Sequence, residues 1–368
     1  LLFGLERKNL MTKQQQNLIV NLRRQLHQCP EISGQETQTK ALLQEFLRAH
    51  TSLELLPCGD GFYAAHREKA PKKPAIALRT DYDALATPDG GAAHLCGHDG
   101  HAASLCAVAL ALEGRTLHRN VFLLFQPAEE TGAGACPCCE LLEKEQVGEI
   151  YGAHNLPGFP AGVVYTRPGT FACASRGVTL RFSGAPTHAA YPENGKNPAL
   201  AVGKLLCALP ELASPAHFTG MTLCTVIGAE LGEKAFGAAC AQAEVWLTLR
   251  AEHNTDLDAL RTAVLGCAKA LAQEAELAFS CEEQDVFPAT ENDEVCAKKV
   301  LALCHGSTLE VPMRWSEDFG HYLLRCPGAF FGIGAGEQHA PLHTADYEYP
   351  DSLLAPTAAA FVTLLENA

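Results

Sequence analysis

Short apolar runs alternate with amphipathic stretches through much of the chain. Four runs have the β-branched and aromatic composition of buried strands: residues 75–79, 121–125, 149–152 and 329–334. Between them, residues 14–28 and 38–47 repeat apolar side chains every three or four positions, as amphipathic helices do. Residues 98–112 form an alanine- and leucine-rich helical stretch that is closed by Gly114. The alternation predicts an α/β domain with a mixed, largely parallel sheet flanked by helices.

The middle of the chain has a different order of elements. Strand-like and helix-like segments follow one another there as βαββαβ, at residues 178–182, 198–209, 221–227, 243–249, 255–274 and 277–281. This order is typical of a small ferredoxin-like α+β domain. We therefore expect a lid domain, residues 175–285, inserted into a discontinuous catalytic domain of residues 11–174 and 286–368. A length of 368 residues also favours two domains.

The charge balance excludes one class of partner. With 28 basic and 42 acidic residues, the formal net charge is -14, which is the wrong sign for binding a phosphate backbone. At 47% hydrophobic and 19% charged residues, the chain can bury a large core and does not have the composition of a disordered protein. We expect a small-molecule substrate and neither a nucleic-acid nor a membrane partner.

The cysteine content and the N-terminal residues indicate the cellular compartment of the protein. Sixteen cysteines are scattered along the chain without a secretory leader, which indicates reduced thiols in a cytoplasmic protein. Residues 1–10 are too short and too charged for a signal peptide or a membrane span. We expect Met11 to be the native start, and we leave residues 1–10 out of the fold.

Acidic and imidazole side chains stand where the predicted strands end. In open α/β sheets the ligand crevice lies beyond the carboxyl ends of the strands, so these groups are expected to converge. The groups are Asp81 and Asp83, Glu129 and Glu130, His154, and His339 and His343.

The segment from His94 to His101 adds a thiol and further imidazoles just before a predicted helix. Thiolate, imidazole and carboxylate are ligands for zinc and related ions, and a mixed set suits two neighbouring ions, with Cys96 as a bridging thiolate. The alternative is that the histidines flank the helix and Cys96 is a small buried apolar side chain. This segment taken alone does not decide between them.

The adjacent carboxylates Glu129 and Glu130 have two interpretations as well. Such a pair is usually a solvated acidic turn. Here it follows an apolar strand and precedes a glycine-rich stretch, which favours a division of roles between a metal ligand and a general base.

Seven sequence blocks, in order, resemble the amidohydrolase branch of the aminoacylase and carboxypeptidase G metallopeptidase family. That branch includes hippurate hydrolases, auxin-conjugate hydrolases and N-acetyl-diaminopimelate deacetylases. The resemblance covers about residues 23–350, and the blocks read RTDYDAL, HLCGHDGH, FQPAEETGAGA, YGAHNLPG, PTHAAYPENGKNP, SEDFGHYL and PLHT.

The resemblance implies a function and a role for each matching residue. It implies hydrolysis of the amide bond of N-acyl amino acids or related small amides. Two divalent ions per subunit are implied, zinc or manganese, with cobalt or nickel as substitutes in vitro. Glu129 would be the general base, Asp83 would orient the site and His188 of the lid would stabilise the oxyanion. The implied metal ligands are Cys96, His98, Glu130, His154 and His343.

The substrate side departs from the family pattern. Pro186 and Thr187 stand before His188 where the branch commonly has two glycines, and Asn197 stands where an aspartate is common. We consider Asn197 and Arg250 as substrate contacts, the latter through bidentate binding of a carboxylate, although a surface ion pair is the more ordinary role for Arg250.

Three rival functions remain. A dipeptidase or carboxypeptidase of the same family would cleave free peptides. A thiol oxidoreductase would use Cys136-Pro-Cys-Cys139, which has no second cysteine pair at zinc-ribbon spacing. A non-catalytic ligand-binding protein would lack metal ligands, whereas this sequence has all of them. We also consider a homodimer formed through the lid domain.

Overall fold

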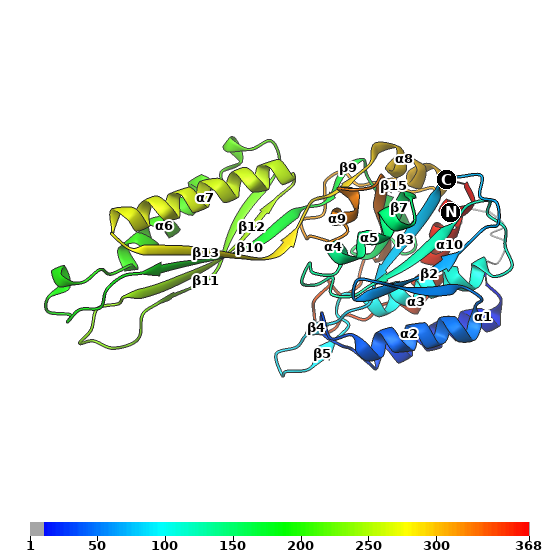
Figure 1. Ribbon diagram of the computed structural model, residues 1–368, viewed down its shortest axis with the longest axis horizontal. Coiled ribbons are helices and arrows are strands. Elements are labelled where there is room, and N and C mark those ends of the chain that lie inside the picture. The colour runs from blue at the N-terminus through cyan, green and yellow to red at the C-terminus, as the bar shows by residue number, and fades with distance from the viewer. Residues whose placement is uncertain (1–10, 368) are drawn as a thin grey trace. The chain divides into compact units, whose positions relative to one another are not determined.

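The computed structural model describes residues 11–367 and divides the chain into two compact units (Figure 1). The first unit extends to Phe171 and includes Thr290–Val311 and the chain from Glu317 onward; the second comprises Ala172–Ala289 and Pro312–Ser316. The second unit is therefore a few residues longer at each end than the expected lid of 175–285. It also takes up Pro312–Ser316, which we had assigned to the catalytic domain. These residues join it because the carbonyls of Met313 and Trp315 accept from the Cys173 N–H, each at 3.1 Å.

A mixed eight-stranded sheet is the centre of the first unit. Four neighbouring strands, β6, β3, β7 and β16, are parallel, whereas β2 runs antiparallel to β6, and β8 runs antiparallel to β16. This confirms the predicted mixed, largely parallel sheet. The order across the sheet is β1 (Glu54–Cys58), β2 (Gly61–His66), β6 (Val121–Gln126), β3 (Ala75–Asp81), β7 (Val147–Pro157), β16 (Gly328–Gly336), β8 (Val164–Thr166) and β15 (Ser307–Thr308).

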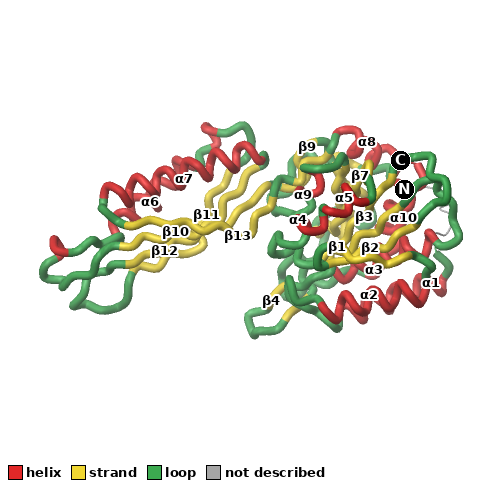
Figure 2. Tube along the Cα trace, viewed as in Figure 1, coloured by secondary structure: helices red, strands yellow, loops and turns green. Residues whose placement is uncertain are grey.

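Helices and strands share one apolar core in this unit. The helix α3 (His98–Leu112) is buried along its whole length, which explains why its sequence is apolar on every side. The other helices that contribute to this core are α1 (Lys13–His27), α2 (Thr37–His50), α8 (Glu294–Leu303) and α10 (Leu354–Asn367). Three short helices complete the unit (Figure 2): α4 (Ala135–Cys138), α5 (Glu140–Lys144) and α9 (Gly320–Leu323). There are also two small two-stranded sheets. In one, β4 (Leu85–Ala86) pairs with β5 (Ala92–Ala93); in the other, β9 (Gly169–Ala172) pairs with β14 (Thr290–Asn292).

The second unit is a four-stranded antiparallel sheet with two helices packed against it. The strand order is β11, β12, β10, β13, and a core of alternating strand residues packs on both helices. Along the chain the elements occur in the predicted βαββαβ order: β10 (Ala174–Ser183), α6 (Ala199–Leu212), β11 (Thr222–Leu231), β12 (Gln242–Ala251), α7 (Asn254–Glu274) and β13 (Ala278–Phe287). Within residues 11–367, no helix combines the length and apolarity needed to cross a bilayer.

Candidate metal centre

The predicted strand ends meet in the first unit. Because β3, β6 and β7 are parallel, the residues at their carboxyl ends reach the same edge of the sheet. Asp83 follows β3, Glu129 and Glu130 follow β6, and His154 lies near the end of β7. His98 begins α3, directly after Gly97, whose φ of 94° is a left-handed conformation that glycine adopts without strain.

Five side chains form two overlapping groups of donors. Cys96, His98 and His154 place ligand atoms within 4.8 Å of one another, and so do Cys96, Glu130 and His343. Cys96 therefore belongs to both groups. The Cys96 Sγ lies 3.3 Å from His154 Nε2, and Glu130 Oε1 lies 3.8 Å from His98 Nε2 and 3.6 Å from His343 Nε2. These are the five ligands that the sequence resemblance implied.

The donor set fits divalent metal. The His98 Nε2 and Glu130 Oε1 atoms are buried, and neither has a hydrogen-bond partner in the part of the chain that the structure describes. Buried polar atoms are normally satisfied, so these two atoms require a further partner. One thiol, three imidazoles and one carboxylate, with the thiol shared between two groups, match the ligand preferences of zinc and related ions.

Hydrogen bonds fix the orientation of the donors. His98 Nδ1 lies 2.9 Å from Asp83 Oδ1, while Asp83 Oδ2 accepts from the Ser33 hydroxyl at 2.5 Å and from the Glu130 N–H at 3.0 Å. Burial opposes ionisation of Asp83, but its hydrogen bond to His98, the His98 charge and the Ser33 bond outweigh this and lower the pKa. The Asp83 carboxylate thus holds both a candidate ligand and the loop that carries Glu130.

The Glu129 loop has an unusual backbone. Ala128 has a φ of 52°, which is costly for a residue other than glycine, and its N–H donates to Glu36 Oε1 at 2.8 Å. The buried Glu36 carboxylate also accepts from Gly34 N–H at 2.9 Å. A buried acid on a neighbouring segment therefore stabilises the conformation that directs Glu129 and Glu130.

Glu129 lies among other buried acids. It is 5% exposed, and ligand atoms of Glu129, Glu317 and Asp318 lie within 4.8 Å of one another. Burial and then the charges of Glu317, Glu130 and Asp318 raise the pKa of Glu129 well above its ordinary value. A raised pKa strengthens a carboxylate as a proton acceptor, which suits the general-base role that we expected. Its Oε2 lies 3.9 Å from His98 Nε2, beside the candidate ligands.

One buried arginine compensates these acids, and the sequence analysis missed it. Arg79 on β3 is 1% exposed and forms ion pairs with Asp81 at 2.7 Å, Glu317 at 3.0 Å and Asp318 at 2.6 Å. Its Nε also donates to Gln126 at 2.8 Å. A charged residue inside an otherwise apolar strand was the available signal, since a buried arginine requires carboxylates around it.

The protonation of the donors follows from their burial. Burial and then Glu130 raise the pKa of Cys96 well above its ordinary value, whereas burial and then His101 lower the pKa of His154. Burial raises the pKa of Glu130 to about 7. Metal ligands must be deprotonated, so metal binding would release the Cys96 proton and make affinity depend on pH.

Three further predicted residues belong to the second unit. His188 is exposed, and its Nδ1 accepts from the Ala190 N–H at 3.0 Å. Asn197 is also exposed and accepts from the Ala199 N–H at 2.9 Å, at the start of α6. Arg250 is half-buried and donates to Ser316 Oγ at 2.5 Å. Since no ion pair involves Arg250 among residues 11–367, its guanidinium keeps donors for another anion.

The remaining predicted candidates lie apart from the donor groups. His339 lines a different cavity, described below. Cys136 is exposed on α4, whereas Cys138 and Cys139 are buried. Cys138 exchanges hydrogen bonds with Cys58, each thiol donating to the other's carbonyl at 3.3 Å. In the described part of the chain, none of these cysteines joins a potential metal-binding group.

Comparisons with known proteins find a matching family model, similar sequences and similar folds. The model of peptidase family M20/M25/M40 matches residues 77–367. N-acetyl-L-cysteine deacetylase of Bacillus subtilis is 31% identical over 363 residues, which cover 92% of this chain and 85% of that protein. Hippurate hydrolase of Campylobacter jejuni is 27% identical over 93% of this chain and 94% of its own. A dinuclear metal-binding M20 peptidase from Bacillus subtilis has a similar fold, with a TM-score of 0.80 and 24% identity over 96% of this chain and 98% of its own.

Proposed function

The chain belongs to peptidase family M20/M25/M40 and is a metal-dependent amidohydrolase, and we propose that it cleaves N-acyl amino acids with two bound metal ions. The observation that carries this proposal is the shared thiol. Cys96 belongs to two donor groups, one with His98 and His154 and one with Glu130 and His343. A donor common to both groups suits a pair of neighbouring ions.

The chain's own residues supply the rest of the chemistry. When bound, divalent ions polarise the scissile carbonyl and make water more acidic. Glu129, with its raised pKa, takes the proton from the attacking water and returns it to the leaving amine. Asp83 keeps His98 in position through its contact with His98 Nδ1.

The choice of substrate rests on the relatives. A deacetylase of N-acetyl-L-cysteine, deacetylases of N-acetyldiaminopimelate and a hippurate hydrolase are all similar to this chain over more than nine-tenths of its length. Their named substrates share an acyl group on the nitrogen of an amino acid.

One screen tests the function. Protein depleted of metal and then reloaded with zinc or manganese is incubated with N-acetyl, N-benzoyl and longer N-acyl amino acids, and the released amine is measured. A parallel panel of free dipeptides tests the dipeptidase rival. Turnover of dipeptides alone would replace the proposed substrate class. Full turnover in metal-free protein that requires a thiol reductant would favour the Cys136–Cys139 oxidoreductase.

We further assign roles to the second unit during turnover. His188 donates a hydrogen bond to the developing oxyanion. Arg250 binds the substrate carboxylate through the N–H groups that do not contact Ser316, and Asn197 is a further substrate contact. Arg250→Gln should then raise KM for N-acyl amino acids while sparing amides that lack a carboxylate. Arg181→Gln, on the adjacent strand β10 but away from the position opposite Arg250, is the matched control.

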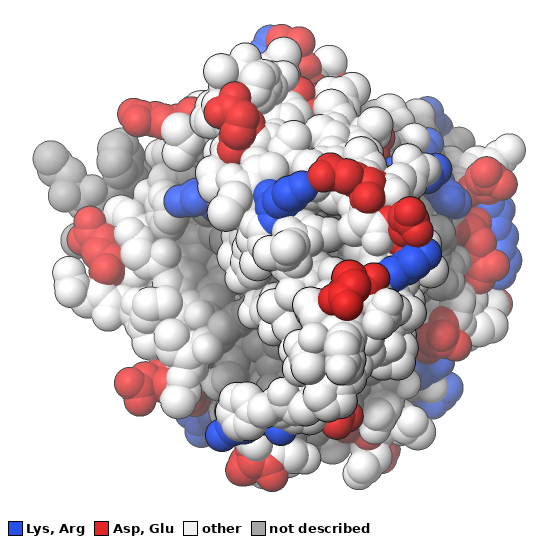
Figure 3. All heavy atoms as spheres, turned by 90° about the vertical axis from the view of Figure 1, so that its left-hand side faces the viewer, with Lys and Arg blue, Asp and Glu red and all other residues white. Residues whose placement is uncertain are grey.

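We also propose a homodimer and a cytoplasmic location. The edge strand β11 exposes Val226, Ile227 and Leu231 at 45%, 62% and 46%, and an unpaired apolar edge favours pairing with a second copy. Figure 3 shows one face of the molecule, on which acidic and basic side chains lie in small mixed groups with broad uncharged areas between the groups. Light scattering measures the molar mass of the wild-type protein and of Ile227→Lys in solution. The lysine charge at the edge strand should weaken the dimer. All sixteen cysteines are free thiols, as a reducing compartment requires.

A further inference from the structure

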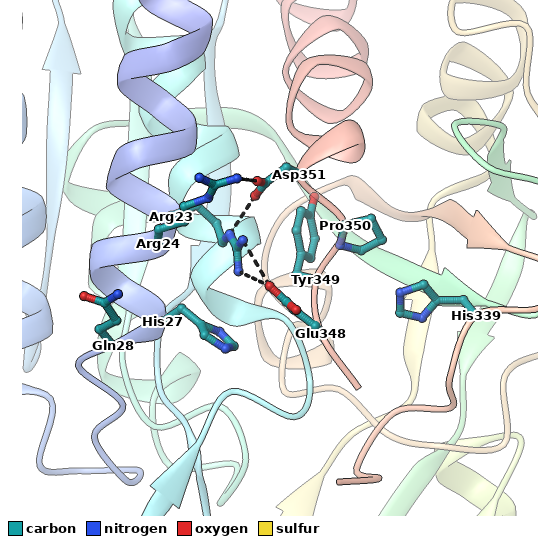
Figure 4. Close-up of a pocket in the computed structure, with 9 residues that line it drawn as sticks. All are labelled: Arg23, Arg24, His27, Gln28, His339, Glu348, Tyr349, Pro350 and Asp351. Carbon is teal, nitrogen blue, oxygen red and sulfur yellow. Dashed lines mark hydrogen bonds and ion pairs between the residues drawn. The ribbon is translucent and has the colours of Figure 1, made fainter. Parts of the chain in front are cut away.

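A cavity in the first unit lies apart from the metal centre and is lined by none of the candidate metal ligands. Its volume is about 550 Å³, within the usual range for small-molecule sites. Figure 4 shows two arginines of α1 on one side, the segment Glu348–Asp351 facing them, and His339 further along the wall. Both signs of charge therefore line a single cavity.

Several polar groups in this cavity keep unused bonding capacity. Arg24 donates one N–H to Asp351 at 2.9 Å and is 61% exposed, so the rest of its guanidinium fork is free. Glu348, 64% exposed, accepts from Arg23 through Oε1 alone, at 3.2 and 3.3 Å. His27 bonds to Asp99 through Nδ1 at 2.8 Å, which leaves its Nε2 available. Basic and acidic side chains that can each form further hydrogen bonds thus line the same cavity.

An unsatisfied imidazole lies behind this wall. His94 is 2% exposed, and neither of its ring nitrogens has a partner within residues 11–367. Its ring stacks on that of His27, with 6.1 Å between centroids, and His27 lines the cavity. Buried polar atoms are normally satisfied, so the ring nitrogens of His94 call for a further polar partner directly behind His27.

We propose that this cavity binds a free α-amino acid. The carboxylate would be held by Arg24 and His27, and the ammonium by Glu348. This inference rests on the proposed function in one respect: an N-acyl amino acid has the carboxylate but no ammonium, and hydrolysis of the amide creates the ammonium. A cavity that requires both charges therefore distinguishes the product from the substrate.

Residues that line the cavity lie close, in sequence or by direct contact, to residues of the metal centre. Asp99, the partner of His27, directly follows the candidate ligand His98 on α3. The Tyr349 ring packs so closely on the same helix that a Cβ on Gly100 would lie 2.2 Å from it. His339 precedes the candidate ligand His343 by four residues. An amino acid in the cavity is therefore placed to affect turnover without occupying the metal centre.

Calorimetric titration of the metal-loaded enzyme tests the binding. The probes are L-alanine, L-leucine, L-glutamate and L-lysine, and each amino acid that binds is compared with its carboxylate-only and amine-only analogues, such as propionate and alaninamide for L-alanine. The test variants are Glu348→Gln and Arg24→Gln. The controls are Glu45→Gln and Arg48→Gln, exposed positions on α2 outside the cavity. All variants are checked for an unchanged thermal transition before titration.

We expect at least one amino acid to bind, and each test variant to weaken it by about tenfold or more, as loss of a charged hydrogen bond predicts. The controls should retain wild-type affinity, and both one-charge analogues should bind more weakly than the amino acid. Binding of none of the four amino acids, or binding that survives both test variants, would overturn the proposal. Equal affinity for propionate would instead make the cavity a simple anion site.

Kinetics provide a second readout. The amino acid that binds should change kcat at saturating N-acyl substrate, and Glu348→Gln should remove that effect. An amino acid that only raises KM competes at the metal centre, which contradicts the proposal. The titration requires no turnover, so failure of the proposed hydrolysis would not be mistaken for failure of this site.

Discussion

Replacing Arg79 by methionine tests whether the charge of Arg79 allows the acidic side chains around Glu129 to be buried in the folded protein. The change keeps most of the apolar stem and removes the guanidinium, which forms ion pairs with Asp81, Glu317 and Asp318 at 2.6 to 3.0 Å. All four side chains are 1% exposed or less, so water cannot replace the lost cation. Removing one partner of a buried pair costs about 3–5 kcal/mol, and three carboxylates share this partner.

The expected loss is large enough for thermal unfolding to resolve. For a unit of this size, about 3–5 kcal/mol corresponds to a fall of roughly 6–20 °C in Tm. Arg181→Met is the matched control, because Arg181 pairs with Glu282 and Glu244 on the exposed surface of the second unit, where ion pairs contribute little. Circular dichroism melts of both variants and wild type give the comparison.

The sign of the pH dependence gives a stricter test. In wild type, burial raises the pKa of Asp318 although the Arg79 charge opposes this; without Arg79, the buried acids must bind protons on folding. A folded pKa above the unfolded value stabilises at low pH, and this contribution is lost as pH rises. The deficit of Arg79→Met should therefore be larger at about pH 8 than at about pH 5.5. A Tm like that of Arg181→Met, or a deficit that grows at low pH, would refute the reasoning.

Four other predictions concern single residues. Glu129→Gln should lower kcat at least about 100-fold with metal content unchanged, whereas Glu130→Gln should lose metal, both measured by kinetics and elemental analysis; the reverse pattern would exchange their roles. Peroxide should modify Cys96 faster in metal-free than in metal-loaded protein, as peptide mass mapping would show, and equal rates would contradict ligation. His188→Ala should lower kcat and kcat/KM together by roughly 100- to 1000-fold, whereas a rise in KM alone would indicate ground-state binding. Burial opposes ionisation of Asp256, but three hydrogen bonds to its carboxylate lower the pKa. Asp256→Ala should therefore lower the free energy of unfolding by about 1–3 kcal/mol at neutral pH, and by less as pH falls through that pKa. A difference between variant and wild type that stays constant with pH in denaturant titrations would contradict a stabilising role for the ionised carboxylate.

The sequence predicted those parts of the fold that local pattern controls. Apolar runs such as residues 121–125 gave the central strands because both faces of a parallel strand are buried. The strand β1 was missed because it lies at the edge of the sheet, where its residues are half-exposed and lack a periodic pattern. The assignment of Pro312–Ser316 to the second unit was also beyond reach, since it depends on hydrogen bonds to Cys173, far away in sequence.

The candidate ligands were accessible to sequence reasoning for a related reason. Glu130 follows β6, His154 lies near the end of β7 and His98 begins α3, and parallel strands bring such positions to one edge of the sheet. The partners of Arg79 were not accessible, because Glu317 and Asp318 lie more than two hundred residues further along the chain and only the folded structure brings them together. His94 was singled out as a possible ligand; its lack of any partner became visible only with the surrounding atoms in place.

The order of the ligands along the chain has a consequence for biosynthesis. Cys96, His98, Glu130 and His154 precede the second unit along the chain, whereas His343 follows it. The second unit is made between them. A nascent chain on the ribosome therefore cannot complete the second group of donors until the whole second unit has been made. Premature termination anywhere in the second unit would release a product that lacks this group.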